Sequence, residues 1–314
     1  MAQPKIIAVV GSTGAQGGGL VKAILADPAG GFAARAITRD VNSDKARALA
    51  ALGAEVVAAD VDDEKSLERA FAGAYGAYCV TFYWAHFKPE KEIVEARNMA
   101  SAAKAAGVSH VIWSTLEDTR TIVPPDSMPT LMDKYKVPHF DAKGESDRFF
   151  REAGLAMTYL YASYYWDNLI YFGAGPTAGP DGVLQFTLPT AGEKMAGVAA
   201  EDIGKVAYGI FKAGSKYQGQ KVGVAGEHLT GAEMAAKLTR ALGREVRHNA
   251  MTPEAYRALG FPGADDLGNM FQFYRDYAGP LNSLRDVARS RELNPALQSF
   301  DAWLARNKDK IPNV

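Results

Sequence analysis

Short apolar runs alternate with segments of helical period through the first half of the chain. The apolar runs, which predict strands, cover residues 5–10, 34–39, 54–60, 77–82, 110–115 and 156–162. The segments between them carry apolar residues at helical spacing, and most end at a glycine. Strands that alternate with helices at this pace form βαβ units, which build a parallel sheet with helices on both faces. We therefore predict an α/β fold with a Rossmann-type doubly wound sheet.

The alternation loosens after about residue 163. Residues 171–192 are crowded with glycine, proline and aromatic residues, and the C-terminal stretch is mostly helical and amphipathic. Strand and helix patterns return over 196–225. This change predicts a first domain over 1–163, to which 196–225 returns in part, and a smaller, mostly helical, discontinuous C-terminal domain over 164–314.

Composition and charge narrow the class of protein. The chain has 314 residues, with 35 Lys and Arg against 36 Asp and Glu and a net charge of −1. No basic block suggests nucleic-acid binding, and no apolar run approaches the roughly 18 residues of a membrane span. The single cysteine, Cys79, excludes an internal disulfide and fits a reducing compartment, and the N-terminus lacks the layout of a signal peptide. We expect a cytoplasmic monomer or homodimer, or a nuclear protein if it is a eukaryotic regulator, with no metal site and no membrane partner.

A glycine-rich stretch, GSTGAQGGGL, occupies residues 11–20 between the first predicted strand and the first predicted helix. Its glycines at 11, 14 and 17 have the spacing G-x-x-G-x-x-G. In that context glycines permit a tight turn and the close approach of a pyrophosphate, whose charge lies at the helix N-terminus. A plain strand–helix turn is the alternative interpretation. The context favours a dinucleotide site.

The end of the second predicted strand indicates which dinucleotide binds. Arg39 offers a planar, permanently charged fork that suits a 2′-phosphate, with Ser43 and Lys45 within reach. Asp40 keeps NAD open, because a carboxylate at this place accepts hydrogen bonds from the ribose 2′-hydroxyl. A solvated arginine is the alternative interpretation of Arg39. We predict that NADP(H) is favoured.

Other candidate contacts follow the third and fourth predicted strands. Asp60 ends the third strand, in position either to contact the adenine amino group or to cap the next helix, a role open also to Asp62 and Asp63. The residues from Thr81 to Tyr83 follow the fourth strand, at the carboxyl edge where ligands bind open α/β sheets. Ordinary loop packing is the alternative for these three.

Five longer motifs carry a family resemblance. They are GSTGAQGG, VTFYW, HFDAKGE, YWDN and MTPEAYRALGFPGADDLGNMFQFY. Over nearly the whole chain the sequence resembles the NmrA-like proteins, atypical members of the short-chain dehydrogenase/reductase superfamily, and most closely the NmrA-like NADPH sensors. The resemblance implies a Rossmann domain that binds NADP and a smaller C-terminal domain that forms a cleft above it.

The resemblance also implies a set of cofactor contacts. By position they are Gly11, Ser12, Thr13, Gly14, Ala15, Gln16, Gly17, Arg39, Asp60, Val61, Thr81, Phe82, Tyr83, Lys143, Tyr165, Trp166, Asp167 and Asn168. Two places depart from close relatives. Asn42 and Ser43 stand where those relatives have basic residues, and Val94 stands where they have a lysine. Both departures weaken the predicted grip on the phosphate.

The working enzymes of that superfamily use Tyr-x-x-x-Lys, in which the tyrosine transfers the substrate proton and the lysine holds the nicotinamide ribose. The equivalent window here reads HFDAK, so Lys143 is present and His139 replaces the tyrosine. A second match, Tyr208-x-x-x-Lys212, lies in the wrong element and is interpreted as helix spacing. His139 is either a weak general acid or a structural residue. Ser114, at the end of the fifth strand, is either a substrate contact or an ordinary strand-end serine.

Two functions remain open. One is a redox sensor or regulator that responds to NADPH/NADP+ and is read by a protein partner, with the loops at 116–139 and 173–195 as candidate moving segments. The first loop has four prolines, which is consistent with a mobile lid. The other is an NADPH-dependent reductase of quinones or similar small apolar carbonyl compounds, in which aromatic residues of 159–172 contact a flat small-molecule ligand in the cleft. The family resemblance favours the sensor.

Overall fold

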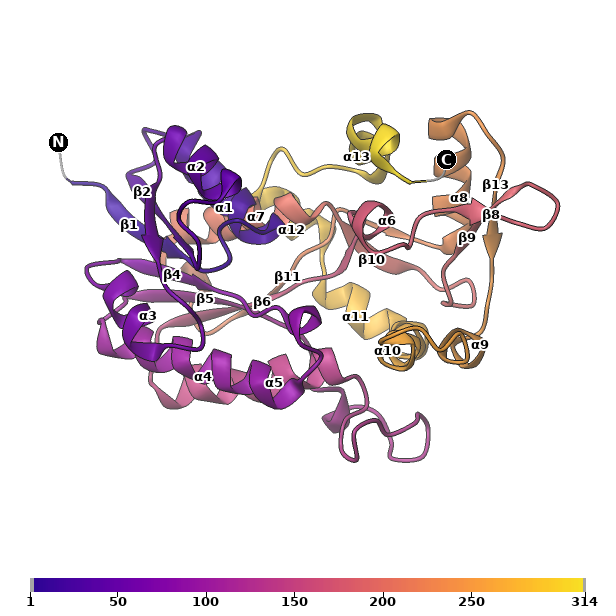
Figure 1. Ribbon diagram of the computed structural model, residues 1–314, viewed down its shortest axis with the longest axis horizontal. Helices are drawn as coiled ribbons and strands as arrows, with labels where there is room; N and C mark the ends of the chain where they lie inside the picture. Colours follow the sequence, from indigo (N-terminus) through magenta and orange to yellow (C-terminus); the bar gives the residue numbers. More distant parts are fainter. Residues whose placement is uncertain (1–2, 313–314) are drawn as a thin grey trace. The chain divides into compact units, whose positions relative to one another are not determined.

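Seven strands form one sheet in the computed structural model, which describes residues 3–312. They are β1 (Lys5–Val9), β2 (Phe32–Thr38), β3 (Glu55–Ala58), β4 (Gly76–Cys79), β5 (His110–Thr115), β6 (Met157–Tyr161) and β11 (Lys221–Gly223) (Figure 1). Their order across the sheet is β11-β6-β5-β4-β1-β2-β3, and all pairings from β6 to β3 are parallel. The predicted Rossmann-type α/β fold is confirmed.

Helices cover both faces of this sheet. They are α1 (Ala15–Leu25), α2 (Asp44–Ala51), α3 (Glu64–Phe71), α4 (Pro89–Ala105), α5 (Pro138–Glu152) and α7 (Ala200–Lys212). Helices α1, α2 and α7 lie on one face and α3, α4 and α5 on the other (Figure 1). The central strands are therefore buried on both sides, and Ile7, Tyr78 and Trp113 are fully buried. This double burial explains why the strands read as continuous apolar runs.

Helices α1 and α7 touch backbone to backbone through two glycines. A Cβ atom on Gly19 would lie 2.2 Å from the carbonyl oxygen of Glu201, and one on Gly204 would lie 2.2 Å from the carbonyl oxygen of Gln16. No larger residue fits at either position without separating the helices. The contact therefore fixes the spacing of α1 and α7, which lie side by side on one face of the sheet.

The order of the strands reverses at β1, which lies between β2 and β4. Connections that leave neighbouring strands in opposite directions open a crevice at their carboxyl ends, and ligands of open α/β sheets bind there. The glycine loop follows β1, and residues 80–82 follow β4. A Cβ atom on Gly11 would lie 2.9 Å from Cγ1 of Val80, so the two connections are in contact.

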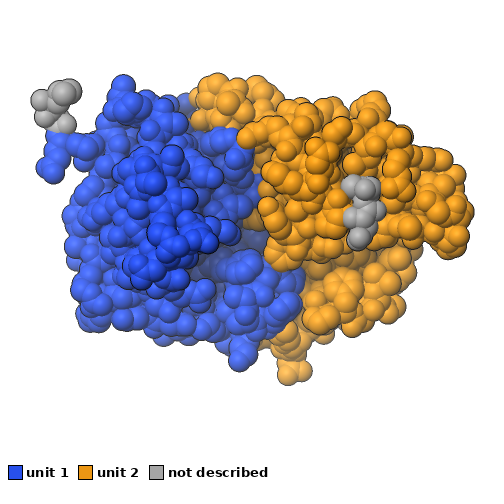
Figure 2. Space-filling view, turned by 45° about the horizontal axis from the view of Figure 1, so that its top comes forward, with its two compact units in different colours: residues 1–118, 139–162, 200–222 blue, residues 119–138, 163–199, 223–314 orange. Residues whose placement is uncertain are grey.

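The chain divides into two compact units, which Figure 2 colours separately. Unit 1 comprises residues 1–118, 139–162 and 200–222, and unit 2 comprises residues 119–138, 163–199 and 223–314. Unit 1 contains the large sheet. Within the described residues, no helix is both long enough and apolar enough to cross a bilayer.

Unit 2 combines short helices with two three-stranded sheets. One sheet has the order β12 (Glu227–Leu229), β10 (Met195–Val198), β7 (Tyr164–Tyr165), and the other β13 (Val246–Asn249), β9 (Leu184–Thr187), β8 (Thr177–Ala178). The helices are α6 (Asn168–Tyr171), α8 (Gly231–Leu242), α9 (Pro253–Arg257), α10 (Ala264–Asp276), α11 (Ala278–Leu284), α12 (Val287–Leu293) and α13 (Phe300–Asn307). The predicted helical C-terminal region is confirmed, and the two small sheets add to it.

Residues 119–138 form a packed strap within unit 2. The ammonium group of Lys136 is buried and donates to the carbonyl oxygen of Met128 at 2.7 Å and to Thr130 Oγ1 at 2.9 Å. From α10, the side-chain amide of Asn269 donates to the carbonyl oxygen of Pro129 at 3.0 Å, and that of Gln272 donates to the carbonyl oxygen of Ser127 at 2.7 Å. Side chains thus satisfy carbonyl groups that no helix or strand satisfies. The segment is therefore packed in this structure, and its role as a mobile lid stays a prediction.

Candidate functional site

The glycine loop turns sharply after β1 and folds back on the first turn of α1. Gly11 has φ +66°, in the left-handed region that favours glycine. A Cβ atom on Gly17 would lie 2.4 Å from the carbonyl oxygen of Gly11, so this position has no room for a side chain. Ser12 is buried, and its Oγ donates to the carbonyl oxygen of Ile37 in β2 at 2.8 Å. The outer surface of the turn is therefore largely backbone.

The N-terminus of α1 suits an anion. Its N-cap residue is Gly14, which has no side chain to accept the free N–H groups, and the first turn holds no acidic residue. Uncapped N–H groups and the positive end of the helix dipole favour a negative group at this place. Gly14 and Ala15 are exposed. The loop therefore fits the phosphates of a dinucleotide, as the glycine spacing predicts.

Different roles fall to Arg39 and Asp40 at the end of β2. Arg39 is exposed, and its guanidinium has no hydrogen-bond or ion-pair partner among the residues that the structure describes. Asp40 Oδ1 accepts the backbone N–H of Asn42 at 2.8 Å. Ser43 is the N-cap of α2, where its Oγ accepts the N–H of Ala46 at 3.3 Å. Asp40 and Ser43 thus support the local turn, and Arg39 keeps an uncompensated charge.

The residues after β3 also make hydrogen bonds within the local turn. Asp63 is the N-cap of α3 and accepts two backbone N–H groups. Asp60 is half-buried and accepts the N–H of Asp62 at 3.0 Å, and the Val61 carbonyl accepts the side-chain amide of Asn98 at 2.9 Å. Capping therefore belongs to Asp63. The contact of Asp60 and Val61 with an adenine stays a prediction.

Lys143 reaches from α5 to the end of β4, where its ammonium group is fully engaged. Its Nζ donates to Thr81 Oγ1 at 2.6 Å, to the Thr81 carbonyl oxygen at 3.2 Å and to Glu92 Oε1 at 2.8 Å. These three acceptors match the three N–H groups of an ammonium. Glu92 belongs to α4 and is fully buried. No motif in the sequence singled out this glutamate.

Aromatic rings surround the segment after β4. The Tyr83 ring is buried and lies 5.2 Å from Trp84 and 5.9 Å from His139, and Trp84 and His139 are 4.8 Å apart, all between ring centroids. Phe82 is 58% exposed. Phe87 is 40% exposed and has φ +56°, a costly conformation for a bulky residue. The cluster presents apolar rings close to Thr81, the partner of Lys143.

Ser114 is buried at the end of β5, where its Oγ donates to Gln16 Oε1 at 2.9 Å. The same Gln16 oxygen accepts the hydroxyl of Tyr78. The structure thus brings together Gln16 and Ser114, two residues that the sequence places far apart. Their roles as cofactor and substrate contacts stay predictions.

The predicted contacts from Tyr165 to Asn168 lie in unit 2. Trp166 is buried there, with ring centroids 5.2 Å from Phe300 and 6.5 Å from Trp303. A Cβ atom on Gly197 would lie 2.3 Å from its indole nitrogen. Trp166 is therefore a core residue of unit 2. The role of this run as cofactor contacts stays a prediction.

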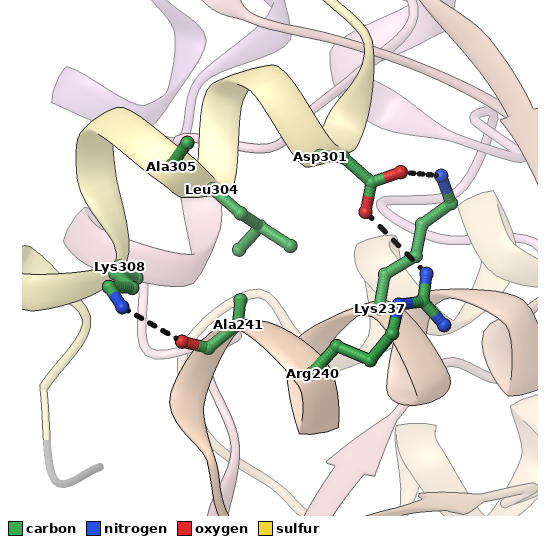
Figure 3. Close-up of a pocket in the computed structure, with 7 residues that line it drawn as sticks. All are labelled: Lys237, Arg240, Ala241, Asp301, Leu304, Ala305 and Lys308. Atoms are coloured by element: carbon green, nitrogen blue, oxygen red, sulfur yellow. Dashed lines mark hydrogen bonds and ion pairs between the residues drawn. The ribbon is translucent and has the colours of Figure 1, made fainter.

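A groove in unit 2 lies between α8 and α13 (Figure 3). Lys237 donates to Asp301, the Arg240 guanidinium lies 3.6 Å from the same carboxylate, and Lys308 donates to the Ala241 carbonyl oxygen at 3.1 Å. Each charged group drawn in the figure therefore has a partner among the residues that line the groove. None of the predicted site residues lines this groove.

The sequence matches the model of the NmrA-like family over residues 3–304. The chain belongs to the NmrA-like family. The resemblance carried by the five motifs is confirmed, and the match includes both structural units.

The proteins to which this chain is similar have names of more than one kind. The chain is similar to the NmrA-like family domain-containing oxidoreductase FrzB of Cladobotryum sp, with 28% identity over 87% of this chain and 85% of that protein. It is 30% identical to the NAD(P)H azoreductase of Xenophilus azovorans, over 90% of this chain and 92% of that protein. A solved structure of NmrA, a negative transcriptional regulator in complex with NADP, has the same fold, with a TM-score of 0.77 at 24% identity over 97% of this chain and 95% of that chain. The names thus include enzymes and a regulator.

A second buried carboxylate lies one turn after Glu92 on α4 of this NmrA-like chain. Glu95 Oε1 lies 3.5 Å from His86 Nε2 and 3.7 Å from Lys91 Nζ. Burial raises the pKa of Glu95 to about 7, and the negative charges of Asp62 and Glu92 act in the same direction. Burial lowers the pKa of His86, so its ring is mostly neutral at pH 7 and gives Glu95 little compensating charge.

This raised pKa predicts a loss of stability as the pH rises. Below about pH 7 the folded chain keeps the Glu95 proton, whereas the unfolded chain loses it above about pH 4.5, so the free energy of unfolding falls between these values. Glu95→Gln removes this titration. We expect the variant to gain ~3 kcal/mol relative to the parent between about pH 5 and pH 8, measured by urea unfolding.

The matched control is Glu152→Gln, at the exposed C-terminal end of α5. Because this side chain is exposed, we expect its replacement to change the stability by less than about 0.5 kcal/mol. Burial also raises the pKa of Asp147 to about 6, so only the difference between variant and parent isolates Glu95. A Glu95→Gln difference that stays constant across this pH range contradicts the assignment.

Proposed function

We propose that this chain binds NADP(H) through unit 1 and acts as a sensor of the NADPH/NADP+ state. The observation that carries the proposal is the state of Lys143, whose three N–H groups are all engaged by Thr81 and Glu92 beside an intact dinucleotide loop. Family membership and the NADP named for a structural relative support the choice of cofactor. The sensor role goes beyond these and is inferred from the residues of the site.

Different residues of unit 1 would bind different parts of the cofactor. The backbone of Gly11–Gly17 and the N-terminus of α1 would hold the pyrophosphate. The uncompensated guanidinium of Arg39 would hold the 2′-phosphate, because a planar fork binds phosphate through paired, charge-assisted hydrogen bonds. Lys143 would hold the ribose next to the nicotinamide, which supplies hydride chemistry when bound.

The residues of this site are poorly suited to donate a proton to a carbonyl substrate. The Tyr-x-x-x-Lys tyrosine is replaced by His139, which is packed against the rings of Tyr83 and Trp84. The Ser114 hydroxyl is buried and donates to Gln16. Lys143 holds its protons in an ion pair with Glu92. These residues favour binding without turnover, and the bound state would then be read by a protein partner.

A reductase is the second candidate, and the aromatic cluster favours it. Phe82 and Phe87 expose ring surface after β4, where Trp84 lies against His139. Flat acceptors such as quinones or azo compounds would stack on such rings and accept hydride without a strong protein acid. One relative is named an NAD(P)H azoreductase, which supports the same class of acceptor.

The choice of NADP over NAD depends on Arg39. We expect Arg39→Ala to weaken NADPH binding about 10- to 100-fold, because a charge-assisted phosphate contact is lost, and to change NADH binding less than about threefold. Dissociation constants from the quenching of protein fluorescence measure both. Arg47→Ala is the matched control, because the Arg47 guanidinium contacts Asn42 and Asp44. Equal weakening of both dinucleotides by Arg39→Ala would show that this residue does not recognise the 2′-phosphate.

The sensor and reductase candidates differ in NADPH consumption. With NADPH and a panel of quinones and azo dyes, we expect saturable binding and no absorbance decay above the protein-free rate. The reason is that no tyrosine stands in the proton-donor position and that the hydroxyl of Ser114 is engaged. Decay that saturates with substrate and disappears in Lys143→Ala would instead establish the reductase.

A further inference from the structure

We infer that Glu92 is the positioning residue of Lys143, the group that fixes the lysine ammonium at the end of β4 for the ribose beside the nicotinamide. The inference rests on the proposed function, since it assigns a role within the same cofactor site. It adds a residue that neither the glycine motif nor the family resemblance identified.

Lys143 needs an anchor because its stem is flexible. Fixing a lysine side chain costs rotamer entropy, which fixed acceptors must offset. The Lys143 side chain is only 12% exposed, and its Nζ lies 5.7 Å from the centre of the Trp113 ring. Glu92, at 2.8 Å, is its charged acceptor, and the other two acceptors are neutral atoms of Thr81.

Glu92 is held rigidly enough to act as that anchor. It lies in the first turn of α4, where the positive end of the helix dipole favours a carboxylate. Its side chain is fully buried, and its backbone N–H donates to the carbonyl oxygen of Lys88 at 3.1 Å. The carboxylate therefore has a fixed place next to β4, and its charge offsets that of the lysine.

The ion pair between Lys143 and Glu92 leaves one buried carboxylate oxygen without a partner in the described part of the chain, which a purely structural ion pair would not be expected to do. The second carboxylate oxygen of Glu92, Oε2, is buried and has no hydrogen-bond partner within the described residues. A buried ion pair stabilises a fold only when its remaining polar atoms are satisfied. The longest of the three lysine bonds, 3.2 Å to the Thr81 carbonyl, is the one that a ribose hydroxyl can replace while Glu92 keeps the ammonium in place. This arrangement points to ligand positioning.

The test compares two ligands that share the adenosine half of the site. Adenosine 2′,5′-bisphosphate carries the 2′-phosphate but has no nicotinamide ribose, whereas NADPH has both. We expect Glu92→Gln to weaken NADPH about tenfold, or ~1.4 kcal/mol, and to leave the bisphosphate within about twofold, as measured by isothermal titration calorimetry. Lys143→Met is expected to give the same pattern. Adding Glu92→Gln to Lys143→Met is expected to cost less than about twofold more, because the two residues act as one unit.

Glu95→Gln is the matched control, a buried glutamate one turn further along α4 whose neighbours are His86 and Lys91. It is expected to leave the ratio of the two affinities unchanged. Should Glu92→Gln fail to fold, Glu92→Asp keeps the charge and withdraws it by one methylene. A loss of about threefold for NADPH alone is then expected, from a weaker charge-assisted bond.

The outcomes separate the inference from the proposed function. Binding of neither ligand by the parent protein would refute the proposed function, and the inference with it. If the parent binds both ligands and Glu92→Gln weakens both equally or neither, the positioning role is wrong and cofactor binding stands. A loss confined to NADPH and absent in the Lys143→Met background supports the role of Glu92.

Discussion

Close backbone contact at glycine is the constraint on which the rest of this structure depends. Gly17 leaves no room between the loop and α1, and Gly19 and Gly204 leave none between α1 and α7. These contacts place the N-terminus of α1 at the reversal of strand order, where Gly11 meets Val80 of the neighbouring connection. The glycine loop, whose geometry suits a phosphate, and the segment after β4, where Thr81 contacts Lys143, thus share one edge of the sheet.

The side chains at this edge of the sheet suit the binding of a cofactor better than the transfer of a proton. Arg39 retains an uncompensated charge, whereas Ser114 and Lys143 direct their donors to protein acceptors. Two carboxylates of α4 are buried: Glu92 pairs with Lys143, and burial raises the pKa of Glu95 to about 7. These contacts support the proposal of cofactor binding without turnover.

Local patterns in the sequence predicted the features that depend on interactions between residues close together in the chain. The strands, the helices and the glycine loop follow from periodicity and backbone freedom. Helix α8 likewise begins with a capping box of Thr230 and Glu233, which have the Thr-x-x-Glu spacing of that motif. Glu92 could not be recognised, because in PEKEIVEARN it resembles its neighbours and only tertiary packing buries it beside Lys143. Lys136 was missed for the same reason, since its acceptors come from residues that lie six to eleven positions earlier in an irregular segment.

We propose that this NmrA-like chain distinguishes the redox states of its cofactor. The most direct test is calorimetric titration of the purified chain with NADPH and with NADP+, because a ligand shifts a conformational equilibrium only by its differential affinity. We expect NADPH to bind at least about tenfold more tightly than NADP+, a difference of ~1.4 kcal/mol. Equal dissociation constants for the two forms would contradict it.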